Sequence, residues 1–158
     1  MFGYSNIGEI PNDLFKGLTH LTDVHEAFTN TQISSIPPDL FKDTPLLSDI
    51  SDCFFGCKKL TSIPRELFSA PNSIENAWAV FHGTNIASIP SGLFDNCSSL
   101  KDLGSAFSGC KELSEVPVDL LSKCRDVSVS GMFVGCDELS TDTKEQVINN
   151  IGSYYKNK

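Results

Sequence analysis

The chain has 158 residues, enough for one domain, and 40% of them are apolar, so a sizeable core is expected. Twelve basic residues stand against 20 acidic ones, which gives a formal net charge of −8. This balance argues against a nucleic acid or an anionic membrane surface as the main partner, because both attract clustered positive charge. No apolar run reaches the roughly 18 residues that a membrane-spanning helix needs.

The first ten residues, MFGYSNIGEI, contain neither the basic nor the apolar stretch of a secretory signal. Three interpretations stay open: a cytoplasmic protein, a piece of a larger secreted protein, or a protein released by another route, such as a virion component. Residues 1–7 align with residues 27–33, so the chain opens in the middle of a repeat unit. This favours further repeats or another domain before Met1; the alternative is a partner that covers this end.

Residues 1 to about 140 consist of a repeated unit. An apolar residue followed by proline recurs with a period of roughly 26 residues, and a leucine lies three positions after each proline. A phenylalanine, or Leu121 in the fifth unit, follows that leucine, and a second phenylalanine comes later in each unit. The prolines are Pro11, Pro37, Pro64, Pro90 and Pro117, and the second phenylalanines are Phe28, Phe54, Phe81, Phe107 and Phe133.

Units of this length with regular leucine positions are typical of leucine-rich repeats. One such unit cannot bury its own apolar face, so neighbouring units must stack. We therefore predict an α/β solenoid of about five units. Each unit would hold a short strand at its Leu-x-x-Ile positions, a turn of helix opened by the proline, and a second helical or irregular segment.

The repeat ends after Leu139. Asp142 and Glu145 have the spacing of a capping box with Asp142 as the N-cap. Val147, Ile148 and Ile151 recur at helical spacing. We predict a capping helix over about residues 143–152, followed by a frayed polar tail from residue 154. The predicted domain organisation is a solenoid over residues 1–140 and a C-terminal capping helix and tail over residues 141–158.

Two segments resemble the BspA-like leucine-rich repeats of bacterial surface proteins: Ala-Phe-Ser-Gly-Cys-Lys-Glu-Leu at 106–113 and Gly-Met-Phe-Val-Gly-Cys-Asp-Glu-Leu at 131–139. The resemblance covers residues 1 to about 140. It implies a non-catalytic recognition module of a bacterial cell-surface adhesin, located outside the cell or on its surface. The implied partner is a protein or a glycan on a host or neighbouring cell. The alternative function is a structural spacer in a larger surface or virion protein.

The six cysteines follow the repeat, and we predict free buried thiols. Three end the Phe-x-Gly-Cys pattern, two lie at a second fixed place after a proline, and one stands where other units have Ala or Val. In that order they are Cys57, Cys110 and Cys136, then Cys97 and Cys124, then Cys53. A disulfide between stacked positions, Cys97–Cys124 or Cys110–Cys136, stays the alternative. A zinc site is not expected, because no Cys-x-x-Cys pair occurs.

The three histidines, His20, His25 and His82, form no metal-binding or catalytic motif, and no phosphate-binding loop or nucleophile elbow occurs. We expect no enzyme, cofactor or metal. A catalytic triad assembled across repeats is the remaining alternative.

The positions that break the repeat are the candidates for ligand binding. Two surface-type positions lie in the second half of each unit, one helical turn apart. They hold what we call the aromatic stripe: Phe55, Trp78, His82 and Val134. Exposed aromatic residues are common hot spots of protein or sugar binding. The alternative is that Trp78 and Phe55 fold back over a gap between turns.

The second candidate surface is the strand face, made by the small residues between the Leu and Ile anchors of each unit. Its main members are Ser35, Ser62, Ser88 and Glu115. On stacked strands these side chains would form a flat polar ladder without a pocket. Such a ladder suits a broad protein contact or a glycan. The alternative is that close strand packing simply requires small residues.

Overall fold

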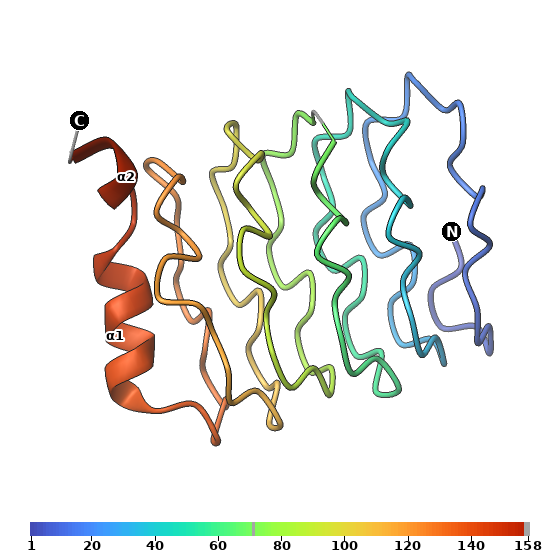
Figure 1. The fold of residues 1–158 in the computed structure, drawn as a ribbon. Helices are drawn as coiled ribbons and strands as arrows, with labels where there is room; N and C mark the ends of the chain where they lie inside the picture. The colour runs from blue at the N-terminus through green and yellow to red at the C-terminus, as the bar shows by residue number, and fades with distance from the viewer. Residues whose placement is uncertain (71, 157–158) are drawn as a thin grey trace.

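The computed structural model describes residues 1–70 and 72–156. Successive units lie side by side along one axis, with residue 1 at one end and two helices at the other (Figure 1). These helices are α1 (Thr141–Asn149) and α2 (Ser153–Lys156). Neither helix is long and apolar enough to span a membrane, and no other helix of the described residues is. The side-by-side arrangement of the units confirms the predicted stacking.

Within the described part of residues 1–140, the units contain turns and isolated bridges rather than the strands and helical segments that we predicted. Four of the five repeat prolines open a single turn by accepting the N–H of the leucine three residues later, as where the Leu40 N–H donates to the Pro37 carbonyl at 3.1 Å. Only about ten residues separate Pro37 from the buried Leu47, and helices this short are marginal in water. At the predicted strands only Ser88 and Glu115 form a bridge.

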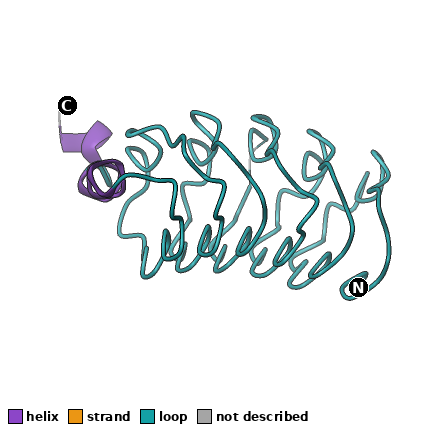
Figure 2. Ribbon diagram, turned by 90° about the horizontal axis from the view of Figure 1, so that it is seen from below, coloured by secondary structure: helices purple, strands orange, loops and turns teal. Residues whose placement is uncertain are grey.

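The regular pairing between units lies instead in the segments that carry the second phenylalanine. We call residues 23–31, 49–57, 76–84, 102–110 and 128–136 the turn face. Four alternate N–H groups of one segment donate to four carbonyls of the next. In the first pair, Val24, Glu26, Phe28 and Asn30 donate to Asp49, Ser51, Cys53 and Phe55 at 2.7–3.0 Å. Figure 2 shows tight turns repeating along one side of the stack and wider loops along the other.

Two residues of each turn-face segment have left-handed backbone conformation. One position is Asn30 in the first full unit and glycine in the later ones, with φ between 54° and 71°. The positive φ favours glycine at this position of the Phe-x-Gly-Cys pattern, and at Gly56 a Cβ would also collide with the Asn30 side chain of the preceding unit. The other position holds Glu26, Asp52, Ala79, Ser105 and Gly131.

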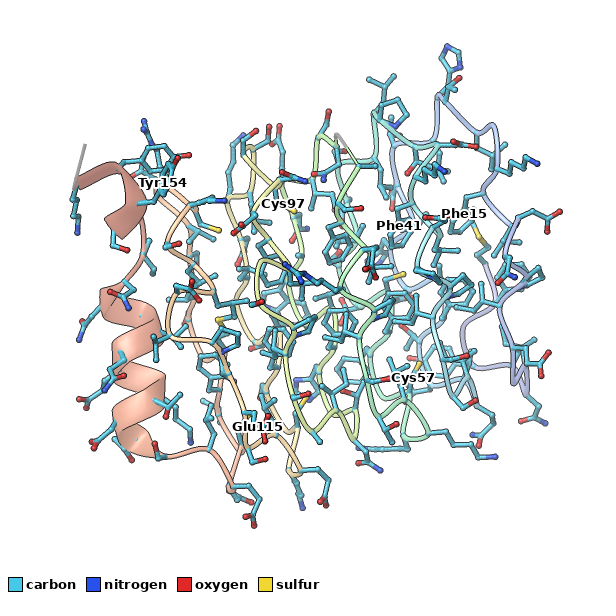
Figure 3. All side chains as sticks on the ribbon, viewed as in Figure 1. Phe15, Phe41, Cys57, Cys97, Glu115 and Tyr154 are labelled. Atoms are coloured by element: carbon cyan, nitrogen blue, oxygen red, sulfur yellow. The ribbon has the colours of Figure 1, made fainter. Side chains whose placement is uncertain are left out.

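The core contains two columns of stacked phenylalanine rings, which pack among buried leucine, isoleucine, valine and cysteine side chains. The column of second phenylalanines starts at Phe2 and ends at Phe133, and its ring centroids are 5.5–6.2 Å apart. The other column contains Phe15 and Phe41, which Figure 3 labels, and continues through Phe68 and Phe94 at 5.9 Å spacing. Each ring thus stacks on the equivalent ring of the neighbouring unit, within the range of aromatic pairs.

The C-terminal helix begins earlier than predicted. The N-cap of α1 is Ser140, whose Oγ accepts the Thr143 N–H at 3.1 Å, so the prediction of Asp142 as N-cap is wrong. Ser140 directly follows the buried anchor Leu139 and has extended backbone, which places its hydroxyl over the first turn. Asp142 lies inside that turn, where its charge suits the helix N-terminus. Val147 is the fully buried residue of α1.

The predicted frayed tail is also wrong for residues 154–156. The Tyr154 N–H donates to the Ser122 carbonyl at 3.1 Å, and the Arg125 guanidinium lies 3.5 Å from the centroid of the Tyr155 ring. These contacts hold α2 against the fifth unit. Residues 157 and 158, the rest of the predicted tail, lie outside the described residues.

Candidate interaction surface

Trp78 is an exposed residue on the turn face, with 44% of its surface accessible. Its backbone N–H donates to the Asn76 Oδ1 at 3.0 Å. The indole ring lies against Gly104 of the next unit, where an added Cβ would come within 2.9 Å of the Trp78 Cδ1. Trp78 thus covers the neighbouring glycine and still offers a large apolar surface to solvent.

Phe55 and His82 form a stacked pair on neighbouring units. Their ring centroids are 4.5 Å apart and the planes are tilted by only 3°. Both side chains are half-buried. Burial lowers the pKa of His82, and the nearby Lys58 ammonium lowers this pKa further. The imidazole is therefore neutral at pH 7, which suits packing on an apolar ring.

Val134 lies two units beyond His82, with 65% of its surface exposed. Its carbonyl accepts the Gly109 N–H at 2.7 Å, as in every other turn-face pair. The structure therefore brings Phe55 and His82 together and places Trp78 on the same segment as His82. It separates Val134 from these three. The aromatic stripe as a ligand site stays a prediction.

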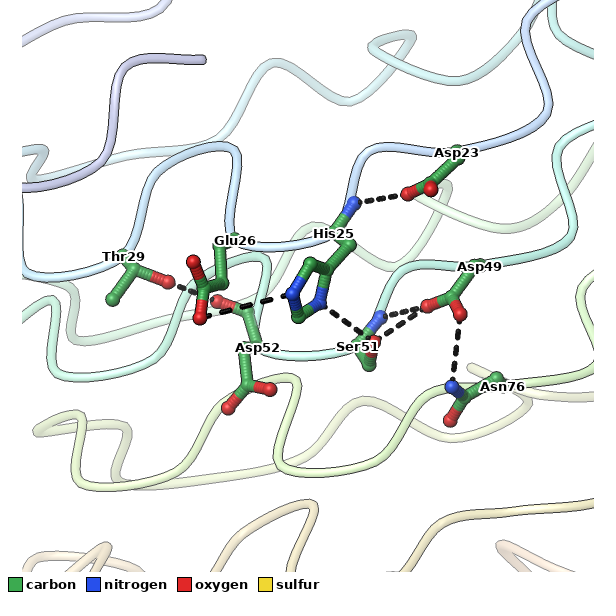
Figure 4. Close-up of polar contacts among 8 residues, drawn as sticks. All are labelled: Asp23, His25, Glu26, Thr29, Asp49, Ser51, Asp52 and Asn76. Atoms are coloured by element: carbon green, nitrogen blue, oxygen red, sulfur yellow. Dashed lines mark hydrogen bonds and ion pairs between the residues drawn. The ribbon is translucent and has the colours of Figure 1, made fainter.

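A polar network beside the stripe escaped the sequence analysis (Figure 4). The Ser51 hydroxyl donates to the Asp49 Oδ1 at 2.6 Å and lies 3.0 Å from the His25 Nδ1. The other Asp49 oxygen accepts the Asn76 side-chain amide at 3.0 Å. The His25 Nε2 lies 3.7 Å from the Glu26 carboxylate. The network therefore connects three consecutive units.

The network follows from a regular position that could have been found in the sequence. An Asp or Asn lies at one constant distance after each of the first four repeat prolines, Pro11, Pro37, Pro64 and Pro90. Each accepts the backbone N–H of the residue two positions later, at 2.7–3.0 Å. These residues are Asp23, Asp49, Asn76 and Asp102. Asp and Asn favour such turns, because their short side chains reach their own backbone.

The carboxylates of this region differ in pKa. Burial alone would raise the pKa of Asp49, but hydrogen bonds from Ser51 and Asn76 and the nearby His25 lower it overall. Burial raises the pKa of Asp52, and the neighbouring Glu26 and Asp49 charges add to that rise. In a catalytic triad the histidine lies between the serine and the carboxylate. Here His25 does lie between Ser51 and Glu26, but the Ser51 hydroxyl donates its proton to the Asp49 carboxylate and not to His25, so the serine is not placed as a triad nucleophile.

The four strand-face residues are all exposed. The Ile89 N–H donates to the Glu115 carbonyl at 3.0 Å, which places Glu115 beside Ser88. The face is not flat throughout. A shallow hollow of about 360 Å³ is lined by Glu115, Pro117 and Thr143, among others, close to the start of α1. This hollow is open to solvent, and the strand-face site stays a prediction.

All six cysteines are free and buried, as predicted. The Sγ of Cys57, Cys110 and Cys136 donates to the carbonyl of a phenylalanine in the preceding unit at 3.1–3.2 Å. Thr84 occupies the same position in the third unit, where its hydroxyl donates to the Phe81 carbonyl at 2.9 Å. Among the residues that the structure describes, no three metal-ligating side chains gather at one point.

The stacked turns, ring columns and repeated glycine turns define a leucine-rich repeat protein. The chain belongs to the family described as BspA type leucine-rich repeat region, whose model matches six copies over residues 4–155. The family is generally a non-catalytic protein-interaction fold, and it is typical of bacterial surface proteins. No curated protein matches the chain.

Three of the solved structures that resemble the chain are leucine-rich repeat proteins of bacteria. A leucine-rich repeat protein of T. pallidum is 23% identical, covering 93% of this chain and 78% of its own, with a TM-score of 0.35. The leucine-rich repeat domain of the type III effector XopL is 15% identical, with coverages of 92% and 64% and a TM-score of 0.43. A Leptospira interrogans leucine-rich repeat protein is 13% identical, with coverages of 94% and 51% and a TM-score of 0.33.

Proposed function

We propose that the chain is a recognition module of a bacterial cell-surface adhesin that binds proteins on a host or neighbouring cell. The exposed Trp78 on a scaffold of a protein-binding family is the observation that carries this proposal. Tryptophan is enriched among binding hot spots, because it buries a large apolar area at a small loss of side-chain freedom. The stacked Phe55–His82 pair lies on the same turn face.

The chemistry of the surroundings suggests the kind of protein surface that fits. Glu26 and Asp52 lie on the two units before Trp78, and the whole chain carries a net charge of −8. Complementary charge raises association rates and excludes wrong partners. We infer a partner that presents an apolar side chain to Trp78, with basic residues around it. The strand face around Ser62, Ser88 and Glu115 is the second surface in this proposal, suited to a broad protein or glycan contact.

The proposal places the chain outside the cell or on its surface, as part of a larger secreted protein. It rests on the family's occurrence among bacterial surface proteins. In this proposal residues 1–140 carry the binding surface, and residues 141–158 cap the last unit. The competing function is a spacer within a larger surface or virion protein, which the binding experiment below separates.

The test is saturable binding of the fluorescently labelled chain to intact cells and to purified extracellular-matrix proteins. We expect Trp78→Ala to weaken binding by about 30-fold or more, as for a hot-spot residue. Leu46→Ala is the matched control, since Leu46 is 48% exposed and lies in a different part of the unit. Both variants should keep the circular dichroism spectrum and unfolding midpoint of the parent chain within the range of surface substitutions.

Two other outcomes reassign the function. If none of the proteins binds any cell or matrix component, the recognition proposal is wrong and the spacer function takes its place. If Trp78→Ala binds as well as the parent chain, the aromatic stripe is not the site. The strand face is then tested with Ser62→Arg and Ser88→Arg, which place a bulky charge on two exposed positions.

A further inference from the structure

The last unit of the turn face ends in a row of unpaired backbone donors. At each of the four complete interfaces between units, four alternate N–H groups donate to carbonyls of the following unit. The equivalent groups of the fifth unit belong to Val129, Gly131, Phe133 and Gly135. Within the described part of the chain, none of these four N–H groups has an acceptor. The array thus ends on a strand-like edge that has donors in the same register as every interior edge.

These donors line a hollow of about 370 Å³ between the fifth unit and α1. Its walls are mainly apolar. Val134 is 65% exposed and Ile148 of α1 is 41% exposed, and both face this hollow. Lys144 is the one charged residue among those that line it. Phe133, the last ring of its column, also lines the hollow and has no further ring stacked on it among the described residues.

The C-terminal helices bind elsewhere on the fifth unit and leave this edge open. The Lys144 Nζ donates to the Cys136 carbonyl at 2.8 Å, which fixes the first turn of α1 at the last residue of the turn face. The Gly152 and Tyr154 N–H groups donate to the carbonyls of Leu121 and Ser122, both at 3.1 Å. The segment after α1 is therefore attached to residues 121–122, and α1 forms only one wall of the hollow.

We propose that this C-terminal edge binds a polypeptide segment that adds one further turn of the repeat's own kind. The four interior interfaces show what covers such an edge: a backbone with four alternate carbonyls and a phenylalanine that stacks on the preceding ring. Addition of a strand to an open edge is a common mode of peptide recognition, in which backbone bonds supply affinity and side-chain pockets supply specificity. The partner is therefore a segment of another chain with a repeat sequence of this type, whose aromatic residue enters the hollow over Phe133.

The test measures amide hydrogen exchange of the full ¹⁵N-labelled chain by NMR, with and without a peptide of residues 126–140, which repeats the fifth turn. We expect saturating peptide to slow exchange at Val129, Gly131, Phe133 and Gly135 by about tenfold or more. The same peptide with Phe133→Asp should have no effect. Unchanged exchange at all four amides with the parent peptide at millimolar concentration overturns the proposal.

Two variants of the chain check the location. Ile148→Lys puts a charge into the hollow and should weaken peptide binding at least tenfold. Val118→Lys is the matched control, because Val118 is 42% exposed and is not part of the hollow. Trp78→Ala should bind the peptide like the parent chain, so failure of the adhesin proposal does not affect this one.

Exchange without peptide also decides between sources of the added turn. Protection of the four amides that appears only in concentrated samples, together with a doubled mass by light scattering, supports the proposal and identifies a second copy as the partner. Protection in dilute samples that remain monomeric shows that the chain covers its own edge, and this overturns the proposal.

Discussion

At the scale of single residues, the side chains that vary between units determine the surface chemistry, while the backbone repeats. The position that holds Trp78 in the third unit holds His25, Ser51 and Gly104 in the first, second and fourth. These four interact in pairs: the His25 ring reaches the Ser51 hydroxyl, and the Trp78 ring covers Gly104. The side chain at this variable position therefore contacts the residue at the same position of a neighbouring unit. A substitution in one unit changes the contacts of the next.

Gly104→Ala should displace the Trp78 indole. Gly104 does not have left-handed backbone conformation, so alanine causes no backbone strain there. The added methyl group would lie 2.9 Å from the Trp78 Cδ1. We expect a red-shifted tryptophan emission and a change in unfolding free energy of at most about 1 kcal/mol, because the ring can swing toward solvent. Trp78 is the only tryptophan, so the spectrum reports it alone. Gly8→Ala is the control, and an unchanged Gly104→Ala spectrum contradicts the prediction.

His82 should titrate below the ordinary histidine pKa of 6.5, since burial and then Lys58 lower its pKa. The folded state thus binds this proton less tightly than the unfolded state. Protonation of His82 therefore has no effect on the unfolding free energy above pH 6.5. It lowers the unfolding free energy as the pH falls below 6.5 toward the lower folded pKa. NMR titration of the His82 ring protons measures the midpoint. Lys58→Gln should raise the midpoint part of the way toward 6.5. A midpoint at or above 6.5 in the parent chain would show that the pKa of His82 is not lowered.

At the scale of elements, the existence of the units follows from the sequence, and their internal conformation does not. The Phe28 and Phe41 columns and the glycine at position 56 were visible as a repeat, because each requires one residue type at a fixed interval. The sequence pattern does not show that the segments predicted as strands and helices form turns. Local pattern cannot tell a one-turn helix from a hydrogen-bonded turn when the segment is too short to nucleate.

The candidate site shows the same division. Exposure of Trp78 and Val134 could be predicted, because both break a regular surface position. The stacking of Phe55 on His82 could not, because it depends on which side of the turn each ring occupies. The Asp and Asn column could have been found from its constant distance to the proline.

The cap of α1 offers a test at this scale. Ser140→Ala removes the hydroxyl that accepts the Thr143 N–H and should lower the unfolding free energy by about 1 kcal/mol. Asp142→Ala removes only a favourable charge in the first turn and should cost about 0.5 kcal/mol. Urea unfolding of the two variants beside the parent chain measures both values. A larger loss for Asp142→Ala would restore the capping box that the sequence suggested.

At the scale of the whole molecule, burial of every cysteine makes the folded array resistant to thiol chemistry. Burial raises the pKa of Cys97 to about 12 and those of Cys124 and Cys136 to about 11. Since the thiolate is the reactive form, we expect slow modification by a thiol reagent at pH 7. All six thiols should react once denaturant unfolds the chain. Rapid modification of any cysteine in the native protein contradicts this prediction.

The same shifts set the alkaline limit of stability. A thiol whose folded pKa lies above its unfolded value of 9.0 favours the folded state fully below pH 9. This contribution is lost as the pH rises from 9 through 11 to 12, because the unfolded thiols ionise first. The unfolding free energy should therefore fall over that range. Cys97→Ala should show a shallower decline than the parent chain, and equal slopes would assign the decline to other groups.

The left-handed residues of the turn face have a consequence for how such a sequence can change over generations. Glu26, Asp52, Ala79 and Ser105 hold a conformation that glycine adopts freely and that costs other residues about 1 kcal/mol each. Glycine stands at this position only in the fifth unit, at Gly131. Four units thus retain a less favourable backbone and display a different side chain at one geometrically constant point. Substitution at this position can therefore change the surface side chain without changing the backbone. Selection for stability alone would favour glycine here, and glycine would remove the variation in side chains.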